Sequence, residues 1–175
     1  MVIDPADSSL TVTPGCVTFS DPSRSTNRSG ENWREAATAR FLPNDPDDLD
    51  AYNAVYRWAF DHFPRWVWCD EAGIVLPVRK CPPAGRRYIV QGSKRELGHL
   101  ACHTRPREVD RSLIANAAHV IAFDLPNPDD RKHVADLCGI PPAQFDHAMR
   151  SLGPREFVWW NVGARRLISC PALRS

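Results

Sequence analysis

Hydrophobic positions along the chain recur with different periods, and these periods predict helices separated by short strands. Residues 47–63 form the clearest helix, because apolar side chains recur there every three or four residues. Those side chains are Leu49, Tyr52, Val55, Tyr56, Ala59, Phe60 and Phe63. Acidic residues favour the first turn of this helix, and Pro64 ends it.

Three short apolar runs predict strands that are buried along their whole length. They are Trp66–Cys69, Gly98–His103 and His119–Leu125. Prolines and glycines indicate the bounds of further helices: Pro82 to about Gly92, Glu108 to Ala115, Pro128 to Cys138, and Pro141 to just before Gly153. Residues 156–161 and 166–169 are joined through Gly163 and predict a terminal hairpin.

The start of the chain is different, because residues 4–48 are rich in Pro, Ser, Thr, Asp and Asn. Short apolar pieces interrupt it at Leu10–Val12 and Val17–Phe19. We therefore expect one domain in three parts. Residues 1–48 are mostly loop after an initial strand, residues 49–153 form an α/β core, and residues 154–175 form the terminal hairpin.

The alternation of apolar strands with helices predicts an α/β fold with a mostly parallel sheet, covered on both faces. Ligands of such sheets lie at the carboxyl ends of the strands. Two groups of polar residues stand at that place in the sequence. Asp70 and Glu71 follow the first apolar strand, and Cys102, His103 and Thr104 end the second.

Composition agrees with one ordinary globular domain, since the 175 residues are 43% hydrophobic and 25% charged. The six cysteines never form C-x-x-C, and the N-terminus has neither the basic start nor the apolar run of a signal peptide. No apolar run reaches the ~18 residues of a membrane span. We therefore expect a cytoplasmic protein with free thiols.

Charge is unevenly distributed although the formal net charge is only +1. Residues 1–50 carry 4 Arg against 9 Asp or Glu, whereas residues 79–111 carry 9 Arg or Lys against 3 Asp or Glu. The basic block can form a surface that faces phosphates or an acidic partner, although a solvated helix face is the commoner explanation of such a block.

Asp70 and Glu71 have the chemistry that a nucleotide hydrolase needs in a Walker B element. One carboxylate at the sheet edge holds magnesium through water, while its neighbour polarises the attacking water. The alternative interpretation is a plain solvated stop to the strand.

The order of motifs after Asp70 resembles the P-loop ATPases of the HerA/FtsK group, which include phage and plasmid DNA-handling ATPases. The stretch Gln91-Gly92-Ser93-Lys94-Arg95 resembles that group's Gln-Gly-basic segment. The stretch from His103 to Val109 keeps the Arg-Pro of its Thr-Gln-Arg-Pro sensor, but His103 and Thr104 replace threonine and glutamine.

Three further segments carry the same resemblance over most of the chain. Residues 113–123 are similar to the group's small-residue segment and following strand, and Pro128-Asp129-Asp130-Arg131 is similar to its Asp-Pro-x-Asp-Arg helix start. Val2-Ile3-Asp4-Pro5 resembles the strand end that follows the P-loop helix. Asp124 departs from the pattern, since the group often has arginine there.

The resemblance implies a partial RecA-like three-layer ATPase core of a DNA-translocating or DNA-packaging kind. It implies ATP and Mg²⁺ as ligands, with Asp70 holding the metal through water and Glu71 activating the attacking water. His103 or Thr104 would sense the γ-phosphate. Arg105, like Arg107 and Arg111, would act on a neighbouring subunit's nucleotide or would simply be solvated, which leaves a homo-oligomer and DNA as expected partners.

A phosphate loop is missing from the sequence. The motif G-x-x-x-x-G-K-[ST] needs a lysine, and the chain has only Lys80, Lys94 and Lys132, none of which fits. The resemblance would place this loop and its strand before Met1, and would leave a slot between the strands that end at His103 and near Asp124. A mis-set start, a partner chain that supplies the P-loop, or a degenerate remnant would each explain the difference. We expect no appreciable ATP hydrolysis by the chain alone.

Other candidate sites have simpler interpretations. His99 and His103 lie on one face of a strand, about 13 Å apart by strand rise, with Cys102 on the other face, which argues against a metal site. Cys69 and Cys102 are read as small core residues. Trp159 and Trp160 would pack at the hairpin or stack bases. A non-enzymatic DNA- or protein-binding module that keeps the ATPase fold is the alternative function.

Overall fold

The computed structural model describes residues 1–5, 15–62 and 66–172. The chain divides into two units that are described separately. The first unit comprises Met1–Thr104 and Glu108–Asp110, and the second comprises Arg105–Arg107 and Arg111–Ser175. Phe63, Pro64 and the apolar piece Leu10–Val12, on which parts of the sequence prediction fall, lie outside the described residues.

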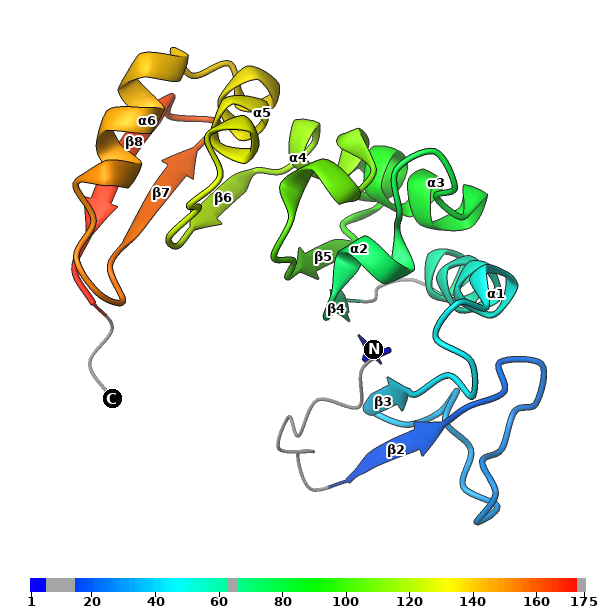
Figure 1. Ribbon diagram of the computed structural model, residues 1–175. Coiled ribbons are helices and arrows are strands. Elements are labelled where there is room, and N and C mark those ends of the chain that lie inside the picture. The colour runs from blue at the N-terminus through cyan, green and yellow to red at the C-terminus, as the bar shows by residue number, and fades with distance from the viewer. Residues whose placement is uncertain (6–14, 63–65, 173–175) are drawn as a thin grey trace. The chain divides into compact units, whose positions relative to one another are not determined.

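The first unit is built on a five-stranded sheet in the order β2-β3-β1-β4-β5. Its strands are β1 (Val2–Ile3), β2 (Cys16–Phe19), β3 (Thr38–Phe41), β4 (Trp66–Cys69) and β5 (Gly98–Ala101). Every pairing in this sheet is parallel, which confirms the predicted α/β class (Figure 1). The sequence prediction missed β3 and saw only an apolar piece at β2, because residues 4–48 read as mostly loop.

Helices α1 (Leu49–Asp61) and α3 (Pro83–Gln91) lie side by side in this unit (Figure 1). The Asp48 side chain caps α1 by accepting a hydrogen bond of 2.9 Å from the backbone N–H of Ala51. The apolar stripe predicted for this helix is buried, at Tyr52, Val55, Tyr56, Ala59 and Phe60. Both helices begin where the sequence predicted them, within two residues.

A glycine lets these two helices approach closely. A Cβ at Gly85 of α3 would lie 2.7 Å from Cδ2 of Leu76 and 3.3 Å from Cδ2 of Tyr56. Val67 and Cys69 of β4 are fully buried, but Trp66 of β4 is 71% exposed and Leu100 of β5 is 52% exposed. The expectation that these two strands are buried along their whole length is therefore wrong for these residues. The short helices α2 (Ala72–Val75) and η1 (Gly92–Arg95) complete the α/β part of this unit.

The second unit holds a separate antiparallel sheet in the order β6-β7-β8. Its elements are η2 (Pro106–Glu108, of which Glu108 belongs to the first unit), α4 (Arg111–Ala115), β6 (His119–Ala122), α5 (Pro128–Cys138), α6 (Pro142–Arg150), β7 (Phe157–Asn161) and β8 (Arg166–Cys170). The predicted terminal hairpin is confirmed as β7 and β8. Gly139 ends α5 in the left-handed conformation with φ 67°, as predicted.

The expectation that β6 is a buried strand of the parallel sheet is wrong. The structure pairs β6 with β7 in antiparallel register. Residues that face each other directly in such a pair share a face, and Ala122 and Val158 are buried on one face while Ile121, on the other, is 57% exposed. The uninterrupted apolar run therefore belongs to a half-buried strand.

Within the described residues, no helix combines the length and the apolar character that a membrane span needs.

Candidate functional site

Three neighbouring strands of the first unit end at the same level. In the sheet register Ile3 of β1 faces Cys69 of β4, and Cys69 faces Ala101 of β5. The residues that follow these positions are Asp4, Asp70 and Cys102. Because all three strands are parallel, their carboxyl ends form one edge, which is where ligands of α/β sheets bind.

Backbone hydrogen bonds continue the pairing beyond the strands. The N–H of Asp70 donates to the carbonyl of Ile3 at 2.9 Å, and the N–H of Cys102 donates to the carbonyl of Cys69 at 2.9 Å. The N–H of Ala72 then donates to the carbonyl of Cys102 at 2.8 Å. The turn that carries Asp70 and Glu71 is therefore fastened to the segment that leads into His103.

Glu71 has an unusual backbone conformation in this turn. Its φ of 49° and ψ of 57° lie in the left-handed region, which costs a residue with a Cβ roughly 1–2 kcal/mol. Its carbonyl accepts a hydrogen bond of 2.9 Å from the N–H of Ile74, in the first turn of α2. Strained backbone of this kind clusters at functional sites, where the surrounding structure holds it in place.

Asp4 is a member of this edge that the sequence analysis did not count among the site residues. It has no solvent exposure, and its Oδ2 accepts a hydrogen bond of 2.6 Å from the Arg40 guanidinium on β3. A buried carboxylate needs such a partner to stay charged. The Val2-Ile3-Asp4-Pro5 segment was the sequence signal for it, but only the fold reveals its partner, Arg40.

Two cysteine thiols lie at this edge, beside the two carboxylates. Burial raises the pKa of the Cys102 thiol, and the negative charges of Asp70 and Glu71 raise it further. Burial also raises the pKa of the Cys69 thiol far above its usual range. Both thiols therefore stay protonated at neutral pH and are not nucleophiles. Cys69 is fully buried, as predicted, whereas Cys102 is exposed, so the expectation that Cys102 is a small core residue is wrong.

The segment after β5 is accessible to solvent. Thr104 is exposed and His103 is half-buried. They follow directly on Cys102, so the structure brings four of the five predicted site residues to one edge of one unit: Asp70, Glu71, His103 and Thr104.

Arg105, the fifth predicted residue, belongs to the second unit. Its Nε lies 3.3 Å from Oδ2 of the buried Asp130, while about half of the arginine side chain is exposed. Arg107 forms an ion pair of 3.0 Å with Asp129. The buried contact to Nε fixes Arg105 at one point and leaves its exposed part available to an anion.

His99, the first of the two histidines considered as metal ligands, lies in an aromatic environment. Nε2 of His99 is 2.9 Å from the Tyr56 hydroxyl, and the ring packs near Tyr88. Burial lowers the pKa of His99 to about 4, so the ring is neutral at pH 7. His99 of β5 thus packs against α1 and α3.

Three of the residues that follow β4 and β5 carry side-chain oxygens: Asp70, Glu71 and Thr104. No group of three His, Cys, Asp or Glu side chains gathers anywhere in residues 1–5, 15–62 and 66–172. The carboxylates of Asp70 and Glu71 and the Thr104 hydroxyl are oxygen donors, the type of ligand that Mg²⁺ prefers.

Comparison with known proteins adds the fold family. No protein-family model matches the chain, and no curated protein sequence matches it. Solved structures do match. The genome packaging NTPase B204 from Sulfolobus turreted icosahedral virus 2 in complex with AMPPCP aligns with a TM-score of 0.76 and 12% identity, over 99% of this chain and 83% of that chain.

Two further structures agree. The same viral NTPase in complex with AMP gives a TM-score of 0.75 at 12% identity, over 99% of this chain and 82% of that one. B204, the DNA-packaging ATPase from Sulfolobus turreted icosahedral virus, gives 0.64 at 13% identity, over 91% and 83%. The chain therefore has the fold of these packaging NTPases.

Proposed function

We propose that the chain forms the Walker B and sensor part of an ATP-hydrolysing core of the HerA/FtsK type, which moves or packages DNA. One observation carries the proposal. The turn with Asp70 and Glu71 ends β4 at the carboxyl edge of a parallel sheet and is hydrogen-bonded through Ala72 to the segment after β5. Structures with the same fold contain AMP, AMPPCP or ATP-gammaS, which supports ATP as the ligand.

The residues of the edge divide the work between them. Asp70 would hold Mg²⁺ through water, and the ion, when bound, would supply positive charge for the phosphate oxygens. Glu71 would accept the proton of the water that attacks the γ-phosphate. His103 or Thr104 donates a hydrogen bond to the γ-phosphate and senses its presence.

Arg105 acts on a nucleotide held by a neighbouring subunit in this proposal. Its Nε is occupied by Asp130, so the exposed end of the guanidinium is free to approach phosphate oxygens. An arginine supplied by a second subunit stabilises transition-state charge in many nucleotide hydrolases. The proposal therefore includes a homo-oligomer.

The phosphate cradle must come from another segment, because the 175 residues contain no G-x-x-x-x-G-K-[ST] sequence. Lys94, the nearest candidate, lies in the 3-10 helix η1. Among the described strands β5 pairs only with β4, and its Leu100 is 52% exposed. A parallel edge strand with an exposed apolar residue favours addition of another strand, which a partner chain carrying the P-loop would supply.

A non-enzymatic module that binds DNA or a protein is the second candidate function. The observation that favours it is the concentration of exposed cations after α2, at Arg79, Lys80, Arg86, Arg87 and Lys94. Salt-dependent DNA binding that survives Asp70→Ala, with no hydrolysis in any form of the protein, would support this alternative.

The test is an ATPase assay in two arms, both with Glu71→Gln as the control. The chain alone is expected to show no appreciable turnover. The same chain, joined at its N-terminus to the strand, P-loop and helix of a HerA/FtsK-type ATPase, is expected to hydrolyse ATP and to lose turnover with Glu71→Gln. Robust Glu71-dependent turnover by the chain alone would refute its predicted inactivity, and a folded but inactive fusion would contradict the proposed site.

A further inference from the structure

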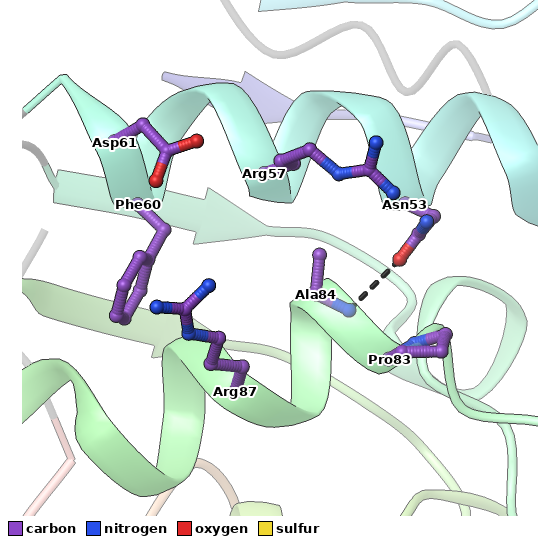
Figure 2. A pocket seen from close by; sticks show the side chains of 7 residues that line it. All are labelled: Asn53, Arg57, Phe60, Asp61, Pro83, Ala84 and Arg87. Atoms are coloured by element: carbon purple, nitrogen blue, oxygen red, sulfur yellow. Dashed lines mark hydrogen bonds between the residues drawn. The ribbon is translucent and has the colours of Figure 1, made fainter.

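A groove runs between α1 and α3 in the first unit (Figure 2). Its volume is about 260 Å³, and it is lined by residues 53, 57, 60 and 61 of α1 and residues 83, 84 and 87 of α3 (Figure 2). We refer to it as the helix groove. Neither the fold comparison nor the proposed ATP site assigns a role to it.

The charged groups of the helix groove are mostly positive. Arg57 and Arg87 are exposed, and neither forms an ion pair with a carboxylate in the described part of the chain. Figure 2 shows the Arg87 guanidinium reaching from α3 toward α1, and that of Arg57 lying along α1 toward Asn53. Asp61 is the single carboxylate among the lining residues.

The buried ring of Phe60 positions two of the positively charged side chains. The guanidinium carbon of Arg87 lies 4.2 Å from the ring centre of Phe60, and that of Arg95 lies 4.4 Å from it. Such contacts hold a guanidinium over the ring and reduce its freedom to turn away. Three arginines therefore share a small region of the surface with one acid, which favours an anionic ligand.

Two features of the helix groove disfavour a mononucleotide as its ligand. The Phe60 ring is only 3% exposed, so it offers no face for a base. The backbone N–H of Ala84, in the first turn of α3, already donates to Oδ1 of Asn53 at 2.8 Å, so it cannot cradle a phosphate. The remaining candidate is an anion that guanidinium groups alone can bind in an open groove.

We propose that the helix groove binds the phosphodiester backbone of DNA through Arg57 and Arg87. Guanidinium groups bind phosphate oxygens with two parallel hydrogen bonds, and a repeating backbone can also reach the cations Lys94 and Arg95 just beyond α3. Contacts of this kind carry no sequence preference. The inference rests on the proposed function, because that function supplies DNA as the polyanion, but its residues lie outside the proposed ATP site.

The test measures binding of the 175-residue chain to a labelled DNA duplex of mixed sequence by fluorescence anisotropy, between about 50 mM and 200 mM salt. The double variant Arg57→Gln/Arg87→Gln is expected to bind about tenfold more weakly at the low-salt end. The slope of log affinity against log salt should decrease by about 1 for each phosphate contact removed. The double variant Arg28→Gln/Arg166→Gln removes two exposed arginines elsewhere and is expected to keep both affinity and slope.

Four outcomes decide the inference. Restored binding in Arg57→Lys, compared with Arg57→Gln, supports a charge contact, and thermal melting checks that each variant is folded. Equal losses in the two double variants would overturn the inference, because they would reflect net charge alone. Competition by polyglutamate as strong as by DNA would also overturn it, in favour of an acidic protein. Asp70→Ala should leave DNA binding unchanged, so failure of the ATP site is distinguishable from failure of the helix groove.

Discussion

The backbone N–H of Ala72 donates a hydrogen bond of 2.8 Å to the carbonyl oxygen of Cys102. This bond joins the residue after Glu71 to the residue before His103. The two turns are therefore held together through their backbones. In the proposed ATPase, this link couples the group that activates water to the group that senses the γ-phosphate.

The left-handed conformation of Glu71 has a measurable cost. We expect Glu71→Gly to be more stable than Glu71→Ala by about 1 kcal/mol in free energy of unfolding, because only glycine adopts a positive φ without a Cβ penalty. Chemical denaturation of both variants gives this difference. Equal stabilities would show that the turn is not strained. The matched control is the comparison of Glu96→Gly with Glu96→Ala, because Glu96 also has a positive φ, 57°.

The ion pair between Arg40 and Asp4 is expected to be a major support of the site. Arg40→Leu leaves the fully buried Asp4 carboxylate without its guanidinium, which costs about 3 kcal/mol of unfolding free energy. Urea denaturation measures this loss. Arg24→Leu removes an exposed partner of Asp21 and should change stability by less than about 1 kcal/mol; an equal effect of the two substitutions would contradict the role given to Asp4.

Two helical glycines provide a test of the packing between α1 and α3. Gly85→Ala would place a Cβ 2.7 Å from Leu76, so we expect a loss of about 1–3 kcal/mol. Gly73→Ala, whose Cβ has no neighbour nearer than 3.9 Å, should be neutral or stabilising, since alanine favours a helix. Thermal unfolding of both variants measures the difference. A Gly85→Ala variant more stable than Gly73→Ala would contradict the close approach of the helices.

The stability of the fold is expected to decrease as the pH is lowered, and His99 is the cause. Its folded pKa of about 4 lies below its ordinary value of 6.5, so the unfolded chain binds a proton first as the pH decreases. Stability from this group is complete above pH 6.5 and is lost progressively down to pH 4, by up to about 3 kcal/mol. His99→Gln should show a shallower loss over this window; an identical pH profile would show that His99 does not contribute.

Much of this fold is predictable from the sequence because its helices are delimited by local chemistry. Pro83 and Pro142 lie at the first position of α3 and α6, and Asp48 caps α1. The position of Asp70 and Glu71 after an apolar strand also predicted their place at the sheet edge. Such signals act within a few residues, so a single sequence displays them.

Contacts between distant segments were not predictable in the same way. Strand β3 contains the polar residues Thr38 and Arg40, and the partner of Arg40 is Asp4, 36 residues away. The pairing of β6 with β7 was missed for a similar reason, since an apolar run does not reveal which face its partner strand covers. The helix groove combines residues of α1 and α3 that only the fold brings together.

The most direct test of the account is whether one divalent ion approaches both turns of the sheet edge. Mn²⁺, a paramagnetic substitute for Mg²⁺, should broaden the amide NMR signals of residues 70–72 and 103–104 together, and this broadening should disappear in Asp70→Asn. Broadening confined to the acidic segment at residues 45–50, or unchanged broadening in Asp70→Asn, would contradict the proposed metal and nucleotide site.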